Sequence, residues 1–207
     1  MALLVRTLLT TVCILAVPSF ASAVPFTITG SSTGADATAS GTLTLVGDTI
    51  TLTLDNTSPF DARITGLGFD LFAGDFTANN STGLNGYAGG DVDEFDFSDG
   101  ALGNVPQFGN TVLDFGWLTG NSFNGGFPND GLSPLGAPLV FSATGDFFAL
   151  TETEIAESLF VRFQRVGADG EGSDVGTPGD VPNVPEPASL LLFGLGLAGA
   201  AAVRRRL

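Results

Sequence analysis

Apolar and polar residues alternate most regularly between residues 42 and 55. Two leucines alternate with threonines in the first half, and an isoleucine and two leucines alternate with threonines in the second half. Successive side chains of a β-strand point to opposite faces, so each half predicts a strand with one aliphatic and one threonine face. Gly47 and Asp48 separate the halves, and a type II′ turn requires glycine first. The segment is therefore predicted to be a β-hairpin.

Further apolar runs of strand length follow along the chain, separated by segments rich in glycine, proline, asparagine and aspartate. They are residues 26–29, 63–72, 94–97, 112–118, 139–143 and 159–166, with loops expected at 56–59, 78–90, 120–136 and 167–180. One short helix is expected at 152–158, because Thr151 and Glu154 form a capping box. Short strands joined by turns predict an all-β fold, an antiparallel, jelly-roll-like β-sandwich over residues 24–166.

The composition of the 207-residue chain excludes most enzyme chemistry. It has no histidine and no lysine, and its one cysteine is Cys13. Ser-His-Asp triads, imidazole metal sites, Schiff bases and lysine-containing phosphate loops are therefore ruled out. We expect the protein not to be an enzyme. A hydrolase that uses a pair of carboxylates stays open as an alternative.

The net charge of the chain between its termini limits which partners it can bind. Between residues 24 and 181 the chain has 21 acidic residues and three arginines, a net charge of −18. Such a surface repels phosphate backbones and anionic lipid headgroups, so we expect no nucleic-acid partner and no peripheral membrane docking. Cations are the small partners that this charge attracts.

The first 23 residues have the three parts of a secretory signal peptide. Arg6 supplies the basic region, residues 8–17 the apolar region, and Ala21 and Ala23 the small residues of a cleavage site. Signal peptidase is expected to cut after Ala23.

The C-terminus has a second ordered arrangement. Pro185, Glu186 and Pro187 precede sixteen mostly apolar residues, 188–203, and three arginines follow, Arg204, Arg205 and Arg206. A helix of sixteen residues spans about 24 Å, slightly less than a hydrocarbon core of about 30 Å. We expect a short transmembrane helix, with the arginines stopping translocation and fixing its orientation.

This arrangement over residues 184–207 resembles the PEP-CTERM sorting signal: the Pro-Glu-Pro triplet, a short glycine-containing apolar helix and a terminal arginine cluster. The resemblance implies that the membrane protease exosortase recognises Pro185, Glu186 and Pro187. It also implies a Gram-negative host that makes exopolysaccharide, and removal of the tail on the way to the surface or matrix. Such tails occur on many unrelated proteins, so the resemblance gives the destination and not the activity.

The segment between the predicted sandwich and this tail, residues 167–183, is rich in glycine, proline and aspartate and has no aromatic residue. It could bury little apolar area, so a flexible spacer is expected.

Two features are candidates for ligand binding. The densest acidic cluster is either a strand with one solvated face or a structural Ca²⁺ site, and its members are Asp91, Asp93, Glu94, Asp96 and Asp99. Trp117, Tyr87 and exposed phenylalanines either stack on sugar rings or belong to the core. Trp117 lies in the apolar run VLDFGWL, which favours the core.

The sequence therefore predicts an exported, non-enzymatic, all-β surface or matrix protein. It would be anchored transiently in the inner membrane, processed by signal peptidase and exosortase, and associated with exopolysaccharide in a biofilm. The alternative from another class is a carbohydrate-binding module of that matrix, dependent on Ca²⁺ or not.

Overall fold

The chain divides into two units, Ala21–Pro185 and a second made of Met1–Phe20 with Glu186–Leu207. The computed structural model describes residues 22–30, 37–71, 78–85, 95–99, 102–145, 147, 150–179 and 181, all of which belong to the first unit. Two five-stranded antiparallel sheets account for about half of these residues.

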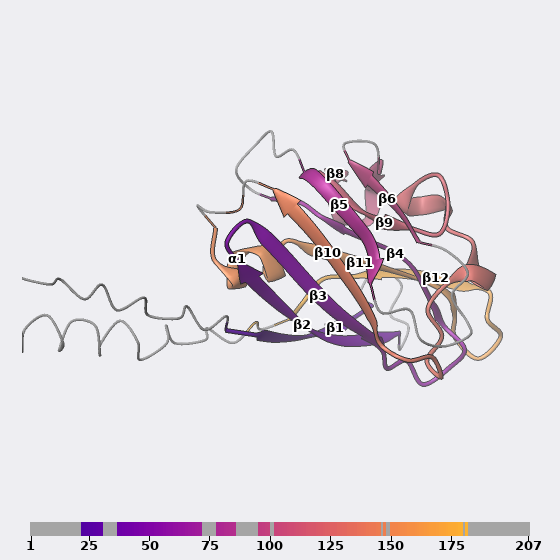
Figure 1. Ribbon diagram of the computed structural model, residues 1–207. Helices are drawn as coiled ribbons and strands as arrows, with labels where there is room; N and C mark the ends of the chain where they lie inside the picture. The colour runs from indigo at the N-terminus through magenta and orange to yellow at the C-terminus, as the bar shows by residue number, and fades with distance from the viewer. Residues whose placement is uncertain are drawn as a thin grey trace, which may run out of the picture. The chain divides into compact units, whose positions relative to one another are not determined.

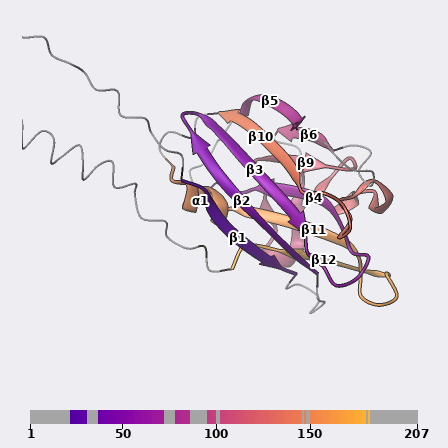
Figure 2. The same cartoon turned by 60° about the horizontal axis from the view of Figure 1, so that its bottom comes forward.

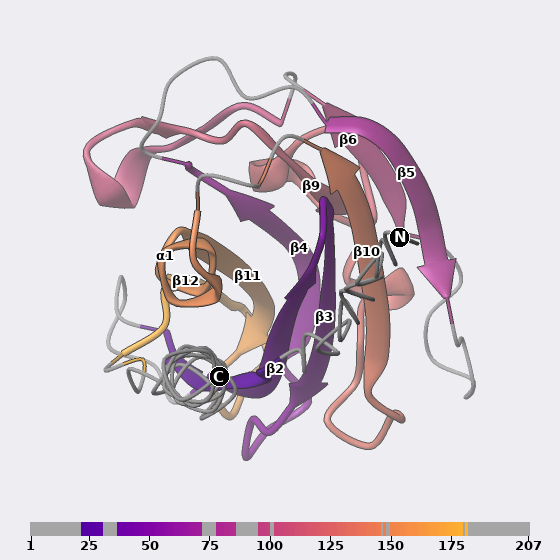
Figure 3. The same cartoon turned by 60° about the vertical axis from the view of Figure 1, so that its left-hand side comes forward.

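The first sheet contains the predicted hairpin. Its strands, in spatial order, are β1 (Val24–Thr29), β2 (Thr38–Val46), β3 (Thr49–Asn56), β10 (Leu139–Gly145) and β5 (Ala78–Asn85) (Figure 1). Figure 3 shows β3, β10 and β5 following one another around a curved sheet. Val46 pairs with Thr49 across the turn, and Gly47 has a φ of 63°, as the first position of a type II′ turn requires. The hairpin prediction is confirmed.

The second sheet consists of β12 (Gly172–Gly176), β11 (Leu159–Val166), β4 (Arg63–Phe69), β9 (Phe115–Leu118) and β6 (Asp96–Asp99), in that spatial order. A small additional pair is formed by β7 (Asn104–Val105) and β8 (Thr111–Val112). Three short 3-10 helices, η1 (Pro106–Phe108), η2 (Phe123–Gly125) and η3 (Pro128–Asp130), lie between β7 and β10 in the sequence. The helix α1 (Glu152–Glu157) contacts β1 and β2 (Figure 2).

Side chains from both sheets form one hydrophobic core. It includes Phe26, Leu43 and Leu52 from the first sheet and Phe69, Phe115, Trp117 and Val161 from the second. The rings of Trp117 in β9 and Phe141 in β10 join the two sheets, with centroids 5.3 Å apart. Trp117 is fully buried, so the interpretation of this residue as a sugar-stacking platform is wrong.

The outer face of the second sheet is also covered. Side chains from the segment between β6 and β9 and from η2 pack there against side chains of the sheet. The cluster consists of Leu102, Val105, Leu113 and Phe123 from the covering segments and Leu118, Phe160 and Val175 from the sheet. Phe108 of η1 and Phe160 of β11 meet edge to face, with centroids 5.4 Å apart. This cover explains why β11 alternates between two apolar environments instead of facing water on one side.

Several predicted elements are confirmed. β11 has the predicted bounds, and α1 begins with the predicted capping box, in which the Thr151 hydroxyl accepts from the Glu154 amide. The strand expected at 94–97 lies two residues later, as β6. The run at 112–118 is divided between β8, which pairs with β7, and β9, which pairs with β4 and β6. Between them the Asp114 carboxylate accepts a hydrogen bond from the Leu71 amide, 2.7 Å away.

The structure corrects three predictions. Residues 78–85, expected to be a loop, form β5, which pairs with β10. The jelly-roll order is wrong, since β1, β2 and β3 are consecutive neighbours in one sheet. The predicted spacer contains β12, which pairs with β11 and buries Asp174 and Val175.

The chain beyond β12 also pairs with the domain. Pro178 forms a bridge with Ile28 of β1, and the Gly179 amide donates to the Thr27 carbonyl at 3.1 Å. The ordered sheet domain therefore reaches at least Gly179, because backbone pairing stabilises a segment whose side chains alone gave no strand signal.

None of the helices within the described residues is long and apolar enough to cross a membrane. The expected transmembrane helix at 188–203 lies outside those residues.

Candidate functional site

Most of the residues that the sequence singled out lie outside the described part of the chain. This holds for Ala21 of the cleavage site, for Pro185, Glu186 and Pro187, for Arg204, Arg205 and Arg206, and for Asp91, Asp93, Glu94 and Tyr87. Ala23 is described and exposed, directly before β1. Asp96 is exposed on β6 and Asp99 ends that strand. The described residues contain no group of three or more acidic, cysteine or histidine side chains that could hold a metal ion.

The structure reveals a different site, a surface pocket of about 380 Å³. Its lining comes from Phe60, Asp61 and Arg165 and from the turn at residues 167–170. Arg63 pairs with Gln164 in the antiparallel ladder of β4 and β11, so the start of β4 adjoins the end of β11. The loop before one strand and the turn after the other therefore meet. We call this site the Phe60 pocket.

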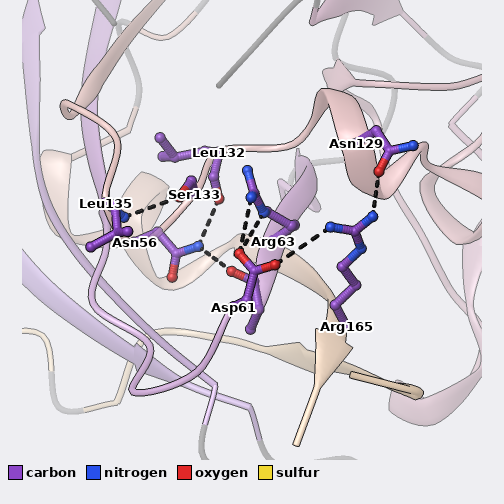
Figure 4. Close-up of polar contacts among 9 residues, drawn as sticks. Asn56, Asp61, Arg63, Asn129, Leu132, Ser133, Leu135 and Arg165 are labelled. Carbon is purple, nitrogen blue, oxygen red and sulfur yellow. Dashed lines mark hydrogen bonds and ion pairs between the residues drawn. The ribbon is translucent and has the colours of Figure 1, made fainter. Parts of the chain in front are cut away.

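Arg165 reaches the pocket through a distortion of β11. The pairing of β11 with β12 shifts between Gln164 and Val166, which makes Arg165 the extra residue of a bulge, and its φ is 56°. A positive φ costs conformational energy for residues other than glycine, asparagine and aspartate. Bulges redirect side chains, and this one brings the guanidinium to two oxygens from distant segments, Asp61 Oδ2 at 3.5 Å and Asn129 Oδ1 (Figure 4).

Asp61 is shared by two arginines. Its Oδ1 accepts from Arg63 Nε at 3.0 Å and lies 2.9 Å from Arg63 Nη2, while its Oδ2 faces Arg165. The Asp61 side chain is 63% exposed and that of Arg165 36%, so solvent screens these ion pairs. Their main effect is therefore to orient the side chains, and they contribute little to stability.

A buried amide holds the loop that carries Phe60 and Asp61. Asn56 is 1% exposed, and its Nδ2 donates to the carbonyls of Ala62 and Leu132, each at 2.7 Å. Its Oδ1 accepts from the Ser58 amide at 3.1 Å. Both polar ends of one buried side chain thus tie the loop after β3 to the segment before β10 (Figure 4). These bonds anchor the backbone on the Phe60 side of the pocket.

Phe60 supplies the apolar wall. It is 39% exposed, one of the few large apolar side chains that the described surface shows to solvent. The pocket thus combines an aromatic ring with a carboxylate, a guanidinium and a neighbouring amide. Its residues come from segments more than 100 positions apart, which is why no local pattern predicted it. None of Phe60, Asp61 and Arg165 was singled out from the sequence.

The third arginine of the domain, Arg162, is not part of the pocket lining. It is 7% exposed, and its Nη1 donates to Asn124 Oδ1 at 3.2 Å. Its Nε has no hydrogen-bond partner among the described residues. Burial lowers the pKa of its guanidinium from the ordinary value.

Comparison with protein families places the other functional element. Residues 183–206 match the model of the PEP-CTERM protein-sorting motif. The match includes Pro185, Glu186 and Pro187 as well as the terminal arginines, so the chain carries the sorting signal of exported proteins that exosortase processes. Comparison with curated proteins and with solved structures finds no match for the chain.

Proposed function

We propose that this protein is an exported, non-enzymatic component of the cell surface or extracellular matrix of a Gram-negative bacterium, associated with exopolysaccharide. The observation that carries the proposal is the match of residues 183–206 to the PEP-CTERM motif. The arrangement of the N-terminus supports it. β1 begins at Val24, so cleavage after Ala23 would leave both sheets whole.

The shared core supports a β-sandwich as the exported body. Phe69 and Phe115 stack with centroids 4.9 Å apart within the second sheet, and Trp117 meets Phe141 of the first sheet. A core of this size needs no disulfide to hold it, which suits a domain without cysteine after signal cleavage.

Processing of the two termini tests the proposal directly. Protein recovered from the surface of the native host should lack residues 1–23 and most of residues 188–207, and intact-mass spectrometry measures both losses. Exported protein that still ends in Arg206 and Leu207 would overturn the sorting mechanism.

Two kinds of variant separate recognition from membrane insertion. Glu186→Ala removes the charge between the two prolines, and Pro187→Ala lets the downstream helix extend over the site that a protease must bind as extended chain. Both should leave uncleaved protein in the inner membrane. Replacing Arg204, Arg205 and Arg206 by glutamine should instead release uncleaved protein or misplace it. Cell fractionation with an epitope tag after Val24 distinguishes these outcomes.

A second candidate function is carbohydrate binding by the sheet domain, and the Phe60 pocket favours it. Ligand pockets combine apolar and aromatic lining with a few convergent polar groups, and Phe60, Asp61 and Arg165 supply an aromatic ring and two such groups. Purified protein mixed with the exopolysaccharide of its host and centrifuged with it tests this function, with and without Ca²⁺.

A further inference from the structure

We propose that the Phe60 pocket binds an uncharged sugar unit of a polysaccharide. This inference deepens the second candidate function and rests on it, because it names the site and the chemical class of the ligand. Four properties of the pocket support it: its size and aromatic wall, its polar groups, its backbone conformation and its charge.

The size and the aromatic wall suit a sugar ring. A volume of about 380 Å³ lies near the lower end of the range of roughly 300–1,000 Å³ for small-molecule pockets. The apolar C–H face of a pyranose can pack on the exposed face of Phe60, which loses contact with water in doing so.

The polar groups suit adjacent hydroxyls. A sugar hydroxyl both donates and accepts, so it needs an acceptor and a donor close together. Asp61 Oδ2 and Arg165 Nη1 are 3.5 Å apart and offer one of each. The guanidinium has five N–H donors, and among the described residues Asp61 and Asn129 engage it, which leaves donors for a ligand.

Two sides of the pocket have backbone held in a defined conformation, one of them at some conformational cost. Arg165 occupies a bulge position with positive φ, where glycine is the usual residue, and the turn that follows has two glycines of positive φ, Gly167 and Gly170. A glycine at 165 would relieve this strain. The arginine instead brings its side chain to Asp61, and strained residues of this kind are concentrated at binding sites. Asn56 fixes the opposite wall.

Charge favours a neutral ligand. Asp61 and Asp169 balance Arg63 and Arg165 at and beside the pocket, so it presents no local excess of positive charge. The domain around it carries −18, which repels polyuronates and other anionic polysaccharides at long range. An uncharged sugar unit needs no excess of positive charge in the pocket, and the negative domain does not repel it.

Affinity electrophoresis of the full chain in a non-ionic detergent tests the inference. Gels contain dextran or mannan as neutral probes, alginate as a polyuronate probe, or the exopolysaccharide of the host. At least one neutral probe should retard the wild type, and alginate should not. Phe60→Ala and Arg165→Gln should each weaken retardation by about tenfold. Phe127→Ala is the matched control, because Phe127 is 53% exposed and does not line the pocket.

The possible failures are distinct. If none of the probes retards the wild type, carbohydrate binding itself is wrong, and the site with it. If the wild type binds but both pocket variants bind within about twofold of it, the function stands and the assignment of the site falls. Stronger retardation by alginate than by the neutral probes would overturn the inference that the ligand is uncharged. Phe60 is partly exposed, so Phe60→Ala should keep the fold, which a thermal melt verifies.

Discussion

Arg162 is the most deeply buried of the three arginines in the sheet domain. The described residues place no carboxylate within ion-pair distance of it, and a single hydrogen bond to Asn124 satisfies one of its nitrogens. A buried charge without a counter-charge opposes folding.

Arg162→Met should therefore raise the free energy of unfolding by about 1–2 kcal/mol, since methionine keeps the length of the side chain and removes its charge. Urea denaturation measures the change. The control is Arg165→Met, which removes screened surface contacts and should change stability by about 1 kcal/mol or less. A clear loss of stability in Arg162→Met would contradict the prediction that this buried charge opposes folding.

The burial of Trp117 could be predicted from the sequence, and the exposure of Phe60 could not. Trp117 lies in an apolar run, and its burial followed from that pattern. Phe60 follows Pro59 in a polar turn, and its exposure depends on the loop that Asn56 fixes through bonds to Ala62 and Leu132. The partners of Asn56 are up to 76 positions away, so no window of local sequence contains the reason for the exposure.

The helix α1 shows how a local signal can determine an element. The Thr151 hydroxyl accepts from the Glu154 amide at 3.2 Å, and a Glu154 carboxylate oxygen accepts from the Thr151 amide at 2.8 Å. Thr151→Ala should lower the free energy of unfolding by about 1 kcal/mol at neutral pH. Thr153→Ala, inside the same helix, is the control and should be neutral or slightly stabilising.

The effect of Thr151→Ala should also depend on pH. The hydrogen bond from the Thr151 backbone, followed by the bond from its side chain, lowers the pKa of Glu154 below its ordinary value of 4.5. A lowered pKa in the folded state gives stability that is present above the ordinary value and is lost as the pH falls through the folded-state value. Thr151→Ala keeps the backbone bond and loses the hydroxyl bond to the Glu154 carboxylate at 2.9 Å. The part of the difference between wild type and variant that this hydroxyl bond contributes should therefore shrink on acidification, as urea denaturation measures. A difference that is the same at neutral and at strongly acidic pH would contradict this.

β12 can be tested as a strand that the sequence did not predict. Val175 is fully buried in it, so Val175→Asp places an unpaired charge under the outer cover of the second sheet. We expect a loss of about 3 kcal/mol or more, measured by denaturation, or failure to fold. Val112→Asp is the matched control, because Val112 is 66% exposed in β8, and it should have little effect. Similar small effects from both substitutions would restore the interpretation of residues 167–183 as a spacer.

The elements that the sequence predicted and those that it missed differ in the origin of their stability. The hairpin alternates apolar residues with threonines between residues 42 and 55, and five of the eight residues of β11, LFVRFQRV, are apolar. β5 has the sequence ANNSTGLN and β12 GSDVG, both rich in turn-forming residues. Each forms a strand because it pairs with the backbone of a neighbouring strand, β5 with β10 and β12 with β11. Tertiary pairing of this kind overrides weak local propensity.

At the scale of the molecule, two kinds of function are encoded differently. The sorting signal is a linear arrangement, so residues 183–206 can be recognised from sequence without any structure. The Phe60 pocket depends on the antiparallel meeting of β4 and β11, and on contacts between Asp61 and Arg165 that are 104 positions apart. A sequence motif could supply the destination, and only the fold could supply a candidate ligand site.

The net charge of −18 leads to a last prediction about the whole domain. Self-repulsion of this size destabilises the folded state, so added NaCl should raise the melting temperature by screening. CaCl₂ at matched ionic strength should raise it further if the hypothesis of a Ca²⁺ site near Asp91 to Asp99 holds. A cation bound only by the folded state adds stability by mass action.

Two double variants decide between screening and a specific site. Asp93→Asn with Asp96→Asn removes two carboxylates of the acidic cluster, and Asp48→Asn with Asp55→Asn removes the same charge from the hairpin. Differential scanning calorimetry in both salts should show that the extra stabilisation by Ca²⁺ disappears in the first variant and persists in the second. Equal effects of the two salts on the wild type would mean that Ca²⁺ acts by screening alone, and β6 would then be a strand with a solvated acidic face.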